Sequence, residues 1–154
     1  MDVEIVNFPE TKVAVIEHHG SPALEHESVI KLVSWCIENK LPPSNLHRSY
    51  GVHYNDPNKT APADYRVDFC VSIVHDVEKN SQGVVTKIIP ANRCAKTRHL
   101  GSRKNISAAL TLYQEWLPQS GEQLAAFPVF FHYVNVGPQV LESEMITDVY
   151  LPIL

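Results

Sequence analysis

Residues 18–21 read HHGS, and residues 99–102, which lie 81 positions later, read HLGS. Several matches in one register are hard to obtain by chance, so the sequence predicts two copies of one structural unit. Two copies are too few for an open solenoid, and we therefore expect one closed domain. Three further pairs keep this spacing or one that is a single position shorter: Trp35 and Trp116, Pro57 and Pro138, Asp68 and Asp148.

Each copy is predicted to contain one or two strands, a helix and two further strands. In both copies the helix is expected to follow the repeated turn, with Ser21 and Ser102 as N-caps. The expected helices cover residues 22–39 and 103–117, with Leu110 and Tyr113 on the apolar side of the second. The expected strands are residues 12–17, 48–54 and 65–74 in the first copy, and 84–89, 93–98, 129–135 and 146–153 in the second.

This order of elements predicts an α+β fold in which two pseudo-symmetric βαββ repeats form one antiparallel sheet. Both helices are expected on one face of the sheet, with a cleft between them. We place the first repeat at residues 1–76, a polar linker at 77–83 and the second repeat at 84–154, within a single domain of residues 1–154. The two repeats are expected to superpose, with Gly20 over Gly101 and Trp35 over Trp116.

The composition excludes several classes of function. The chain has 154 residues and a net charge of −4, which argues against direct binding of nucleic acid, since that needs a clustered basic surface. No run of apolar residues approaches the length of about 18 that a membrane span requires, and the N-terminal residues show no secretory signal. We therefore expect a cytoplasmic protein. The densest basic stretch favours a solvated loop and contains Lys96, Arg98, Arg103 and Lys104.

The cysteines and histidines give no sign of a cofactor or metal centre. Three widely spaced cysteines are typical of reduced, buried thiols. None of the eight histidines belongs to an HExxH motif, and no CxxC pair is present. The cysteines are Cys36, Cys70 and Cys94.

Four segments together point to a family. They are residues 51–57 (GVHYNDP), 65–70 (YRVDFC), 113–121 (YQEWLPQSG) and 147–153 (TDVYLPI). In this order and spacing they resemble the GyrI-like family, also called the AraC-type effector-binding domain. The resemblance covers about residues 3–154. It implies a two-repeat fold with a ligand cleft between the helices, in a family that includes drug sensors, a gyrase-modulating protein and free-standing multidrug binders.

The chain departs from the family at one strand. Many members read PxFExY where residues 128–133 read PVFFHY, so Phe131 occupies the position of the family's glutamate. That glutamate is associated with cationic drugs and, in a hydrolytic branch, with catalysis. The resemblance thus implies a free-standing binder of hydrophobic or aromatic compounds and no enzyme.

Two alternatives remain open at this point. One is a protein-interaction module that modulates DNA gyrase or another topoisomerase subunit. The other is a hydrolase, for which Ser21 or Ser102 beside a histidine could act as nucleophile, although helix capping explains both serines more simply.

An aromatic pocket is the predicted ligand site. Tyr50 and Phe131 are separated by the same offset as the repeated turns, so we interpret them as repeat mates on equivalent strand faces. Residues two apart on a strand share a face, and the helices are expected to add tryptophan and tyrosine rings. His53 and His132 are predicted to point away from this face. The predicted ligand-binding residues are Trp35, Tyr50, Val52, Tyr113, Trp116, Phe131 and Tyr133.

Overall fold

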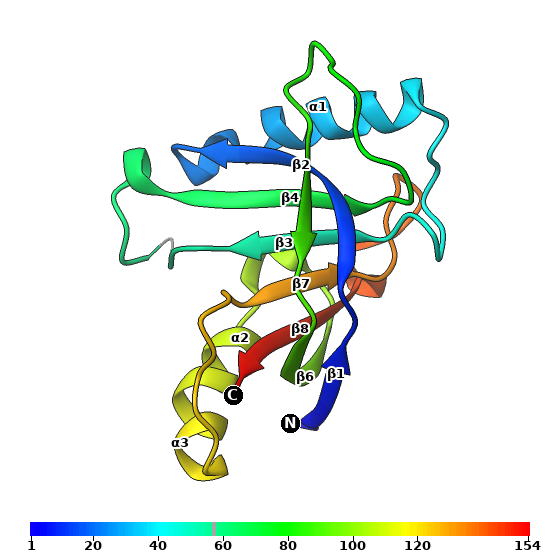
Figure 1. The fold of residues 1–154 in the computed structure, drawn as a ribbon. Helices are drawn as coiled ribbons and strands as arrows, with labels where there is room; N and C mark the ends of the chain where they lie inside the picture. The colour runs from blue at the N-terminus through cyan, green and yellow to red at the C-terminus, as the bar shows by residue number, and fades with distance from the viewer. Residues whose placement is uncertain (57) are drawn as a thin grey trace. The chain divides into compact units, whose positions relative to one another are not determined.

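The computed structural model describes residues 1–56 and 58–154, with the side chain of Asn105 left out (Figure 1). Pro57, one half of a predicted repeat pair, lies outside the described residues. The chain forms two compact units. The α1 unit contains Thr11–Ile89, and the α2 unit contains Met1–Glu10 together with Pro90–Leu154.

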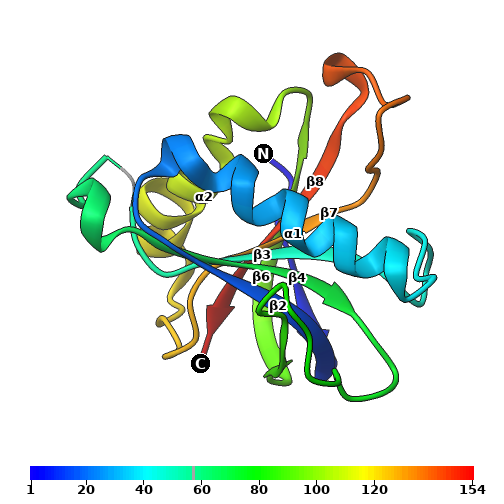
Figure 2. The ribbon, with the colours of Figure 1, turned by 90° about the horizontal axis from the view of Figure 1, so that it is seen from above.

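The α1 unit is a four-stranded antiparallel sheet with one long helix. Its strand order is β3-β4-β2-β5. Helix α1 (Glu25–Glu38) packs on the two central strands, β2 and β4 (Figure 2). The strands are β2 (Thr11–His19), β3 (Ser49–His53), β4 (Arg66–Ser72) and β5 (Val85–Ile89).

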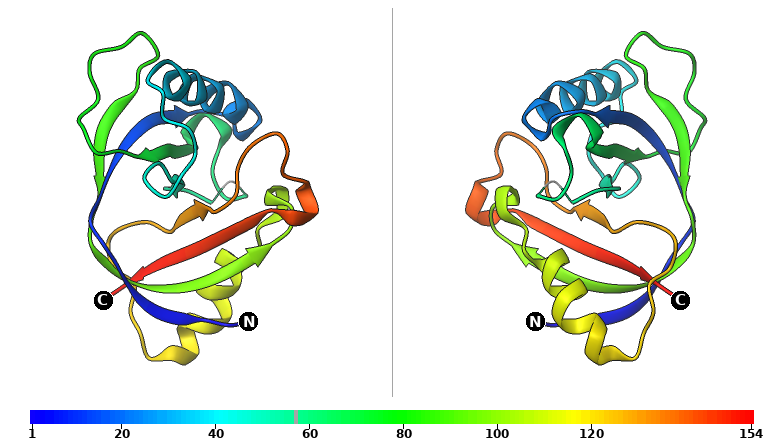
Figure 3. Two further views of the ribbon diagram at one scale, coloured as in Figure 1. Left: turned by 90° about the vertical axis from the view of Figure 1, so that its right-hand side faces the viewer. Right: turned by 90° about the vertical axis from the view of Figure 1, so that its left-hand side faces the viewer.

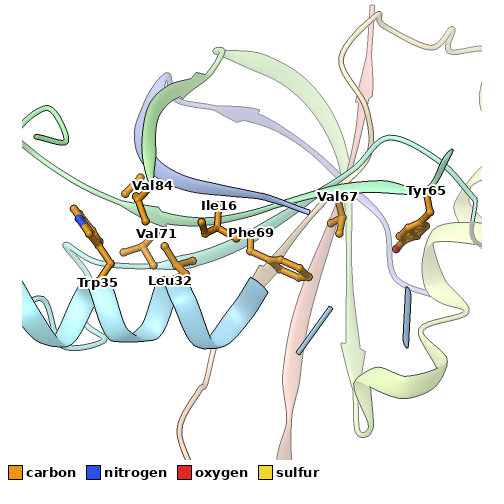
Figure 4. Packing of buried hydrophobic residues seen from close by; sticks show 9 residues of the cluster. Ile16, Leu32, Trp35, Tyr65, Val67, Phe69, Val71 and Val84 are labelled. Atoms are coloured by element: carbon orange, nitrogen blue, oxygen red, sulfur yellow. The ribbon is translucent and has the colours of Figure 1, made fainter. Parts of the chain in front are cut away.

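The start of α1 follows from its sequence. The side chain of Ser21 accepts a hydrogen bond from the amide of Ala23, and Pro22 begins a single 3-10 turn before the α-helix. From the helix, Leu32 and Trp35 point into the apolar side of the sheet, where Figure 4 shows them against Val71 and Phe69. The core therefore lies between α1 and one face of the sheet.

The α2 unit has the same plan. Its strand order is β1-β6-β8-β7, and its helical segment packs on β6 and β8 (Figure 3). The strands are β1 (Glu4–Phe8), β6 (Asn92–Leu100), β7 (Phe130–Tyr133) and β8 (Ile146–Ile153). The helical segment comprises α2 (Ala108–Thr111), a π-helical turn (Leu112–Trp116) and α3 (Leu117–Ser120).

The second helix differs from its prediction. After the turn at Ser102, Ile106 has an extended backbone, so the α-helix begins only at Ala108. The π-helical turn then shifts the side chains that follow it around the helix. Ala108 and Leu112 are buried, whereas Leu110 and Tyr113, expected on the apolar side, are about half exposed.

The compact units do not coincide with the sequence repeats. Strand β1 is the first strand of the first repeat, and it pairs with β6. Its counterpart in the second repeat is β5, which pairs with β2. The first strand of each repeat is therefore hydrogen-bonded to the second strand of the other repeat. Each four-stranded sheet thus takes three strands from one repeat and one from the other.

The part of the chain that the structure describes contains neither a membrane-spanning helix nor a group of metal ligands. None of its helices is long and apolar enough to span a membrane. No three histidine, cysteine, aspartate or glutamate side chains gather there as ligands for a metal ion.

Candidate functional site

The strand register corrects the predicted relation between the two aromatic strands. Tyr50 pairs with Cys70 in the α1 unit, and Phe130 pairs with Tyr150 in the α2 unit. The offset between these two pairs is 80 and not 81, so the counterpart of Tyr50 is Phe130 and not Phe131. A slip of one residue moves a strand side chain to the opposite face of its sheet. The interpretation of Tyr50 and Phe131 as repeat mates is therefore wrong.

In the α1 unit, the predicted site residues consequently lie on two faces. Tyr50 and Val52 share their face with Asp68 and Cys70, away from α1. Trp35 lies on the α1 side, where it is buried in the core. These three residues do not form one pocket within this unit.

The residue that matches Tyr133 in the α1 unit is His53. His53 pairs with Val67, and Tyr133 pairs with Thr147, so both lie on the helical side of their sheets. Burial lowers the pKa of His53 to about 4. His132 pairs with Asp148 and points away from Phe131, as predicted, whereas His53 lies on the helical side, so the prediction that both histidines point away from the aromatic face is wrong for His53.

In the α2 unit, by contrast, three predicted residues come together. Phe131, Tyr133 and Trp116 all pack against the cluster that contains Ala108 and Leu112. The rings of Phe131 and Tyr133 meet edge to face, with 6.4 Å between their centroids. Trp116 and Tyr133 keep part of their surface exposed, so the group is open on one side. We call Trp116, Phe131 and Tyr133 the aromatic site.

Arg103 borders the aromatic site and was not predicted. Its guanidinium lies over the ring of Tyr133, with 5.1 Å between Cζ and the ring centroid. Nε donates to Oγ1 of Thr147 at 2.8 Å, and Nη2 donates to the carbonyl oxygens of Ile146 and Asn135. The sequence predicted a solvated basic loop around Arg103, whereas in the structure its guanidinium packs on Tyr133 and bonds to residues distant in the chain.

The buried carboxylates of the two units lie on the other faces of the sheets. Asp148 pairs with His132, so it points away from Phe131 and Tyr133. Arg98 donates to both of its carboxylate oxygens, and this partner holds the pKa of Asp148 below its usual value against the effect of burial. Asp68 accepts from Tyr54 and Lys87 in the equivalent position. Neither carboxylate belongs to the aromatic site.

The repeated His-Ser pairs have a structural role. Nε2 of His18 bonds to the carbonyl of Ser21, and Nε2 of His99 bonds to the carbonyl of Ser102. The hydroxyl of each serine accepts from the backbone amide two residues later, as expected for a cap. These contacts support the capping interpretation over the nucleophile interpretation.

Comparisons with known proteins agree with this fold. The model of the family described as "GyrI-like small molecule binding domain" matches residues 1–154. A probable transcriptional regulator of Escherichia coli K12, YgiV, is 38% identical over 99% of this chain and 96% of its own length. A protein named DNA gyrase inhibitor in Erwinia billingiae is 28% identical over 99% of this chain and 97% of its own length.

Solved structures show the same architecture. The C-terminal domain of EcmrR superposes with a TM-score of 0.76 at 16% identity, covering 99% of this chain and 97% of that domain. A protein named as a hydrolase from Listeria innocua gives a TM-score of 0.69 at 13% identity, covering 99% of this chain and 91% of its own. At these identities the likeness concerns the fold alone.

Proposed function

Since this chain belongs to the GyrI-like small-molecule-binding domain family, we propose that it senses or sequesters hydrophobic aromatic compounds. The aromatic site of the α2 unit contacts the ligand. Within that site, Phe131 replaces the carboxylate that the family resemblance associates with cations. The prediction that the ligand lies between the two repeats stays a prediction.

The open group of aromatic rings carries this proposal. Aromatic faces favour stacking with planar apolar ligands, and such ring pairs contribute about 0.5–1.5 kcal/mol beyond the burial of their surface. A cation gains about 0.5–2 kcal/mol from an aromatic face, but the guanidinium of Arg103 already lies over Tyr133 and repels it. We therefore expect a neutral compound to bind at least as tightly as a cation of the same shape.

Calorimetric titration with a matched pair tests the proposal. 2-Naphthylmethanol and 2-naphthylmethylammonium have the same ring and differ in charge. The natural protein should bind the alcohol at least as tightly as the ammonium. Phe131→Glu should make the ammonium bind about tenfold more tightly than the alcohol, because a buried carboxylate attracts the cation. Val134→Glu places a carboxylate on an exposed residue three positions after Phe131 and should leave the order unchanged.

Two results would contradict the proposal. If the natural protein binds neither compound, the aromatic site does not bind small aromatic ligands. If it prefers the ammonium and Phe131→Glu does not change that preference, Phe131 does not contact the ligand. Thermal unfolding of each variant controls for loss of the fold.

Modulation of a topoisomerase subunit is the second candidate, and an apolar stripe on α1 favours it. Ile30, Val33 and Ile37 follow helical spacing and are 49%, 49% and 72% exposed. The relative named DNA gyrase inhibitor suggests the partner to test. If this candidate holds, the natural protein should slow supercoiling by purified gyrase, and Val33→Lys should weaken the effect. Unchanged supercoiling at excess protein would remove this candidate.

Hydrolysis is the third candidate. It is favoured only by the name of the Listeria innocua structure. A nucleophile and a base would have to converge beside the aromatic site. The Ser21 and Ser102 hydroxyls accept capping hydrogen bonds at the repeated turns, which supports a structural role for both serines.

A further inference from the structure

Arg103 differs from its basic neighbours in the charge of its partners. Lys96 and Arg98 contact Asp148, and Lys104 contacts Glu142. Among the described residues, Arg103 contacts no carboxylate. The atoms that accept its hydrogen bonds belong to a threonine hydroxyl, an asparagine side chain and two backbone carbonyls. A guanidinium is charged at every physiological pH, so its charge is left without a counter-ion there.

The local fold does not require this arginine. The equivalent position in the first repeat is Pro22, and the same serine cap forms beside it. The loop before the last strand of each repeat also closes in the same way. The side chain of Asn55 accepts from the amide of Arg66, and that of Asn135 accepts from the amide of Ile146, each at 2.8 Å. The first repeat builds this turn and loop without a guanidinium at that position.

The position of Arg103 makes its charge available to a ligand. It is half buried, which lowers its pKa through desolvation but leaves it protonated. Nε and Nη2 are used for bonds to the protein. Nη1 has no hydrogen-bond partner among the described residues. Since it is not among the fully buried atoms that lack a partner there, it keeps some exposure to solvent. Two nitrogens thus fix the guanidinium in place over the ring of Tyr133, while the third makes no bond to the described residues.

We propose that Arg103 makes this site selective for aromatic carboxylates. The ring of the ligand packs on the aromatic site, and its carboxylate accepts a hydrogen bond from Nη1 of Arg103. A charge-assisted bond of this kind is stronger than one between neutral groups, and a fixed guanidinium loses little freedom on binding. The inference rests on the proposed function, because it names the class of ligand for the same site.

The test compares 2-naphthoate with 2-naphthamide, which have the same ring and nearly the same shape. At pH 7 the carboxylic acid is ionised and the amide is neutral. Titration calorimetry of the full chain should give a dissociation constant about tenfold lower for 2-naphthoate. The difference should shrink in 0.5 M NaCl, since salt screens the ion pair. Arg103→Gln should abolish the difference while 2-naphthamide keeps its affinity.

Arg66→Gln is the matched control. Arg66 also lies over a tyrosine ring, 4.1 Å from the centroid of Tyr54, but it contacts Glu17 and is in the other unit. Its replacement should not change the preference for 2-naphthoate. Arg103→Lys keeps the positive charge without the planar guanidinium and should retain part of the preference for 2-naphthoate. This variant also tests the inference if Arg103→Gln does not fold.

The outcomes separate this inference from the proposed function. If the natural protein binds 2-naphthamide but has no preference for 2-naphthoate, the inference is wrong and the proposed function stands. The inference is also wrong if the preference persists in a folded Arg103→Gln protein. If neither compound binds the natural protein, both proposals fail together.

Discussion

His53 illustrates how one half-buried side chain links stability to pH. Its pKa is about 4 in the folded protein and about 6.5 in the unfolded chain, so the unfolded state binds the proton first as the pH falls. The contribution of neutral His53 to stability is therefore complete above pH 6.5 and is lost between about 6.5 and 4.

We expect His53→Gln to reduce this pH dependence. Between pH 7 and pH 5, the free energy of unfolding of the natural protein should fall by about 1–2 kcal/mol more than that of the variant. Urea unfolding at a series of pH values measures the difference. His26→Gln, on the exposed surface of α1, serves as the control and should follow the natural protein. Parallel curves for the His53 variant and the natural protein would contradict the assignment.

At the scale of elements, the sequence predicted which segments form strands better than which way they face. Alternation of apolar residues placed the strands β3, β4, β7 and β8 close to their observed limits. The face of β7 was assigned through an offset of 81, whereas the shift to 80 occurs before β3 and β7. Asn55 and Asn135 share the offset of 80 and make the same hydrogen bond, so they carry the signal that would have corrected it.

Other features of the site could not be read from the sequence. The π-helical turn leaves Tyr113 exposed while Trp116 joins the aromatic site, and no residue pattern in this segment announces a π-turn. Arg103 was hidden for a different reason. Its hydrogen-bond partners are Asn135, Ile146 and Thr147, and none of them supplies a carboxylate. Because these residues are distant from Arg103 in the chain, the sequence gives no sign that its charge lacks a counter-ion.

The repeated turn gives a prediction at the same scale. Gly20 and Gly101 have φ values of 112° and 106°, and their amides donate to the carbonyls of Tyr65 and Met145. A Cβ at either position meets no atom within 4 Å, so the cost of alanine comes from the backbone alone. Gly20→Ala and Gly101→Ala should each lower the free energy of unfolding by about 1–3 kcal/mol.

Lys40→Gly is the opposite control for this prediction. Lys40 has a φ of 57°, in the left-handed region that glycine adopts without steric cost, so the substitution should not destabilise the protein through its backbone. Denaturant unfolding of the three variants measures all the effects. A neutral result for one glycine and a large loss for the other would show that the two turns are not equivalent.

At the scale of the whole molecule, the exchange of first strands separates the sequence repeat from the folded unit. Strands β1 and β5 are short and partly exposed, with no feature that specifies β6 or β2 as the partner. Either pairing satisfies the same pattern of apolar residues. The repeat could therefore be recognised from sequence, while the exchange depends on where each strand finds its hydrogen-bonding edge.

Two fragments of equal length distinguish the repeat from the unit. Residues 11–89 contain α1 and the complete sheet β3-β4-β2-β5, whereas residues 1–79 contain β1 in place of β5 and lack its partner β6. Fragment 1–79 also lacks Val84, which is 4% exposed in the core beside Trp35, and Thr86, whose hydroxyl accepts from the amide of Val77. Loss of one buried valine alone removes about 1.5–3 kcal/mol of transfer free energy.

Fragment 11–89 should therefore show a cooperative thermal transition and protected β2 amides in hydrogen exchange. Fragment 1–79 should unfold at a lower temperature or lack a transition. Equal stability of the two fragments would mean that β5 adds nothing to the α1 unit, and greater stability of fragment 1–79 would identify the sequence repeat as the folding unit.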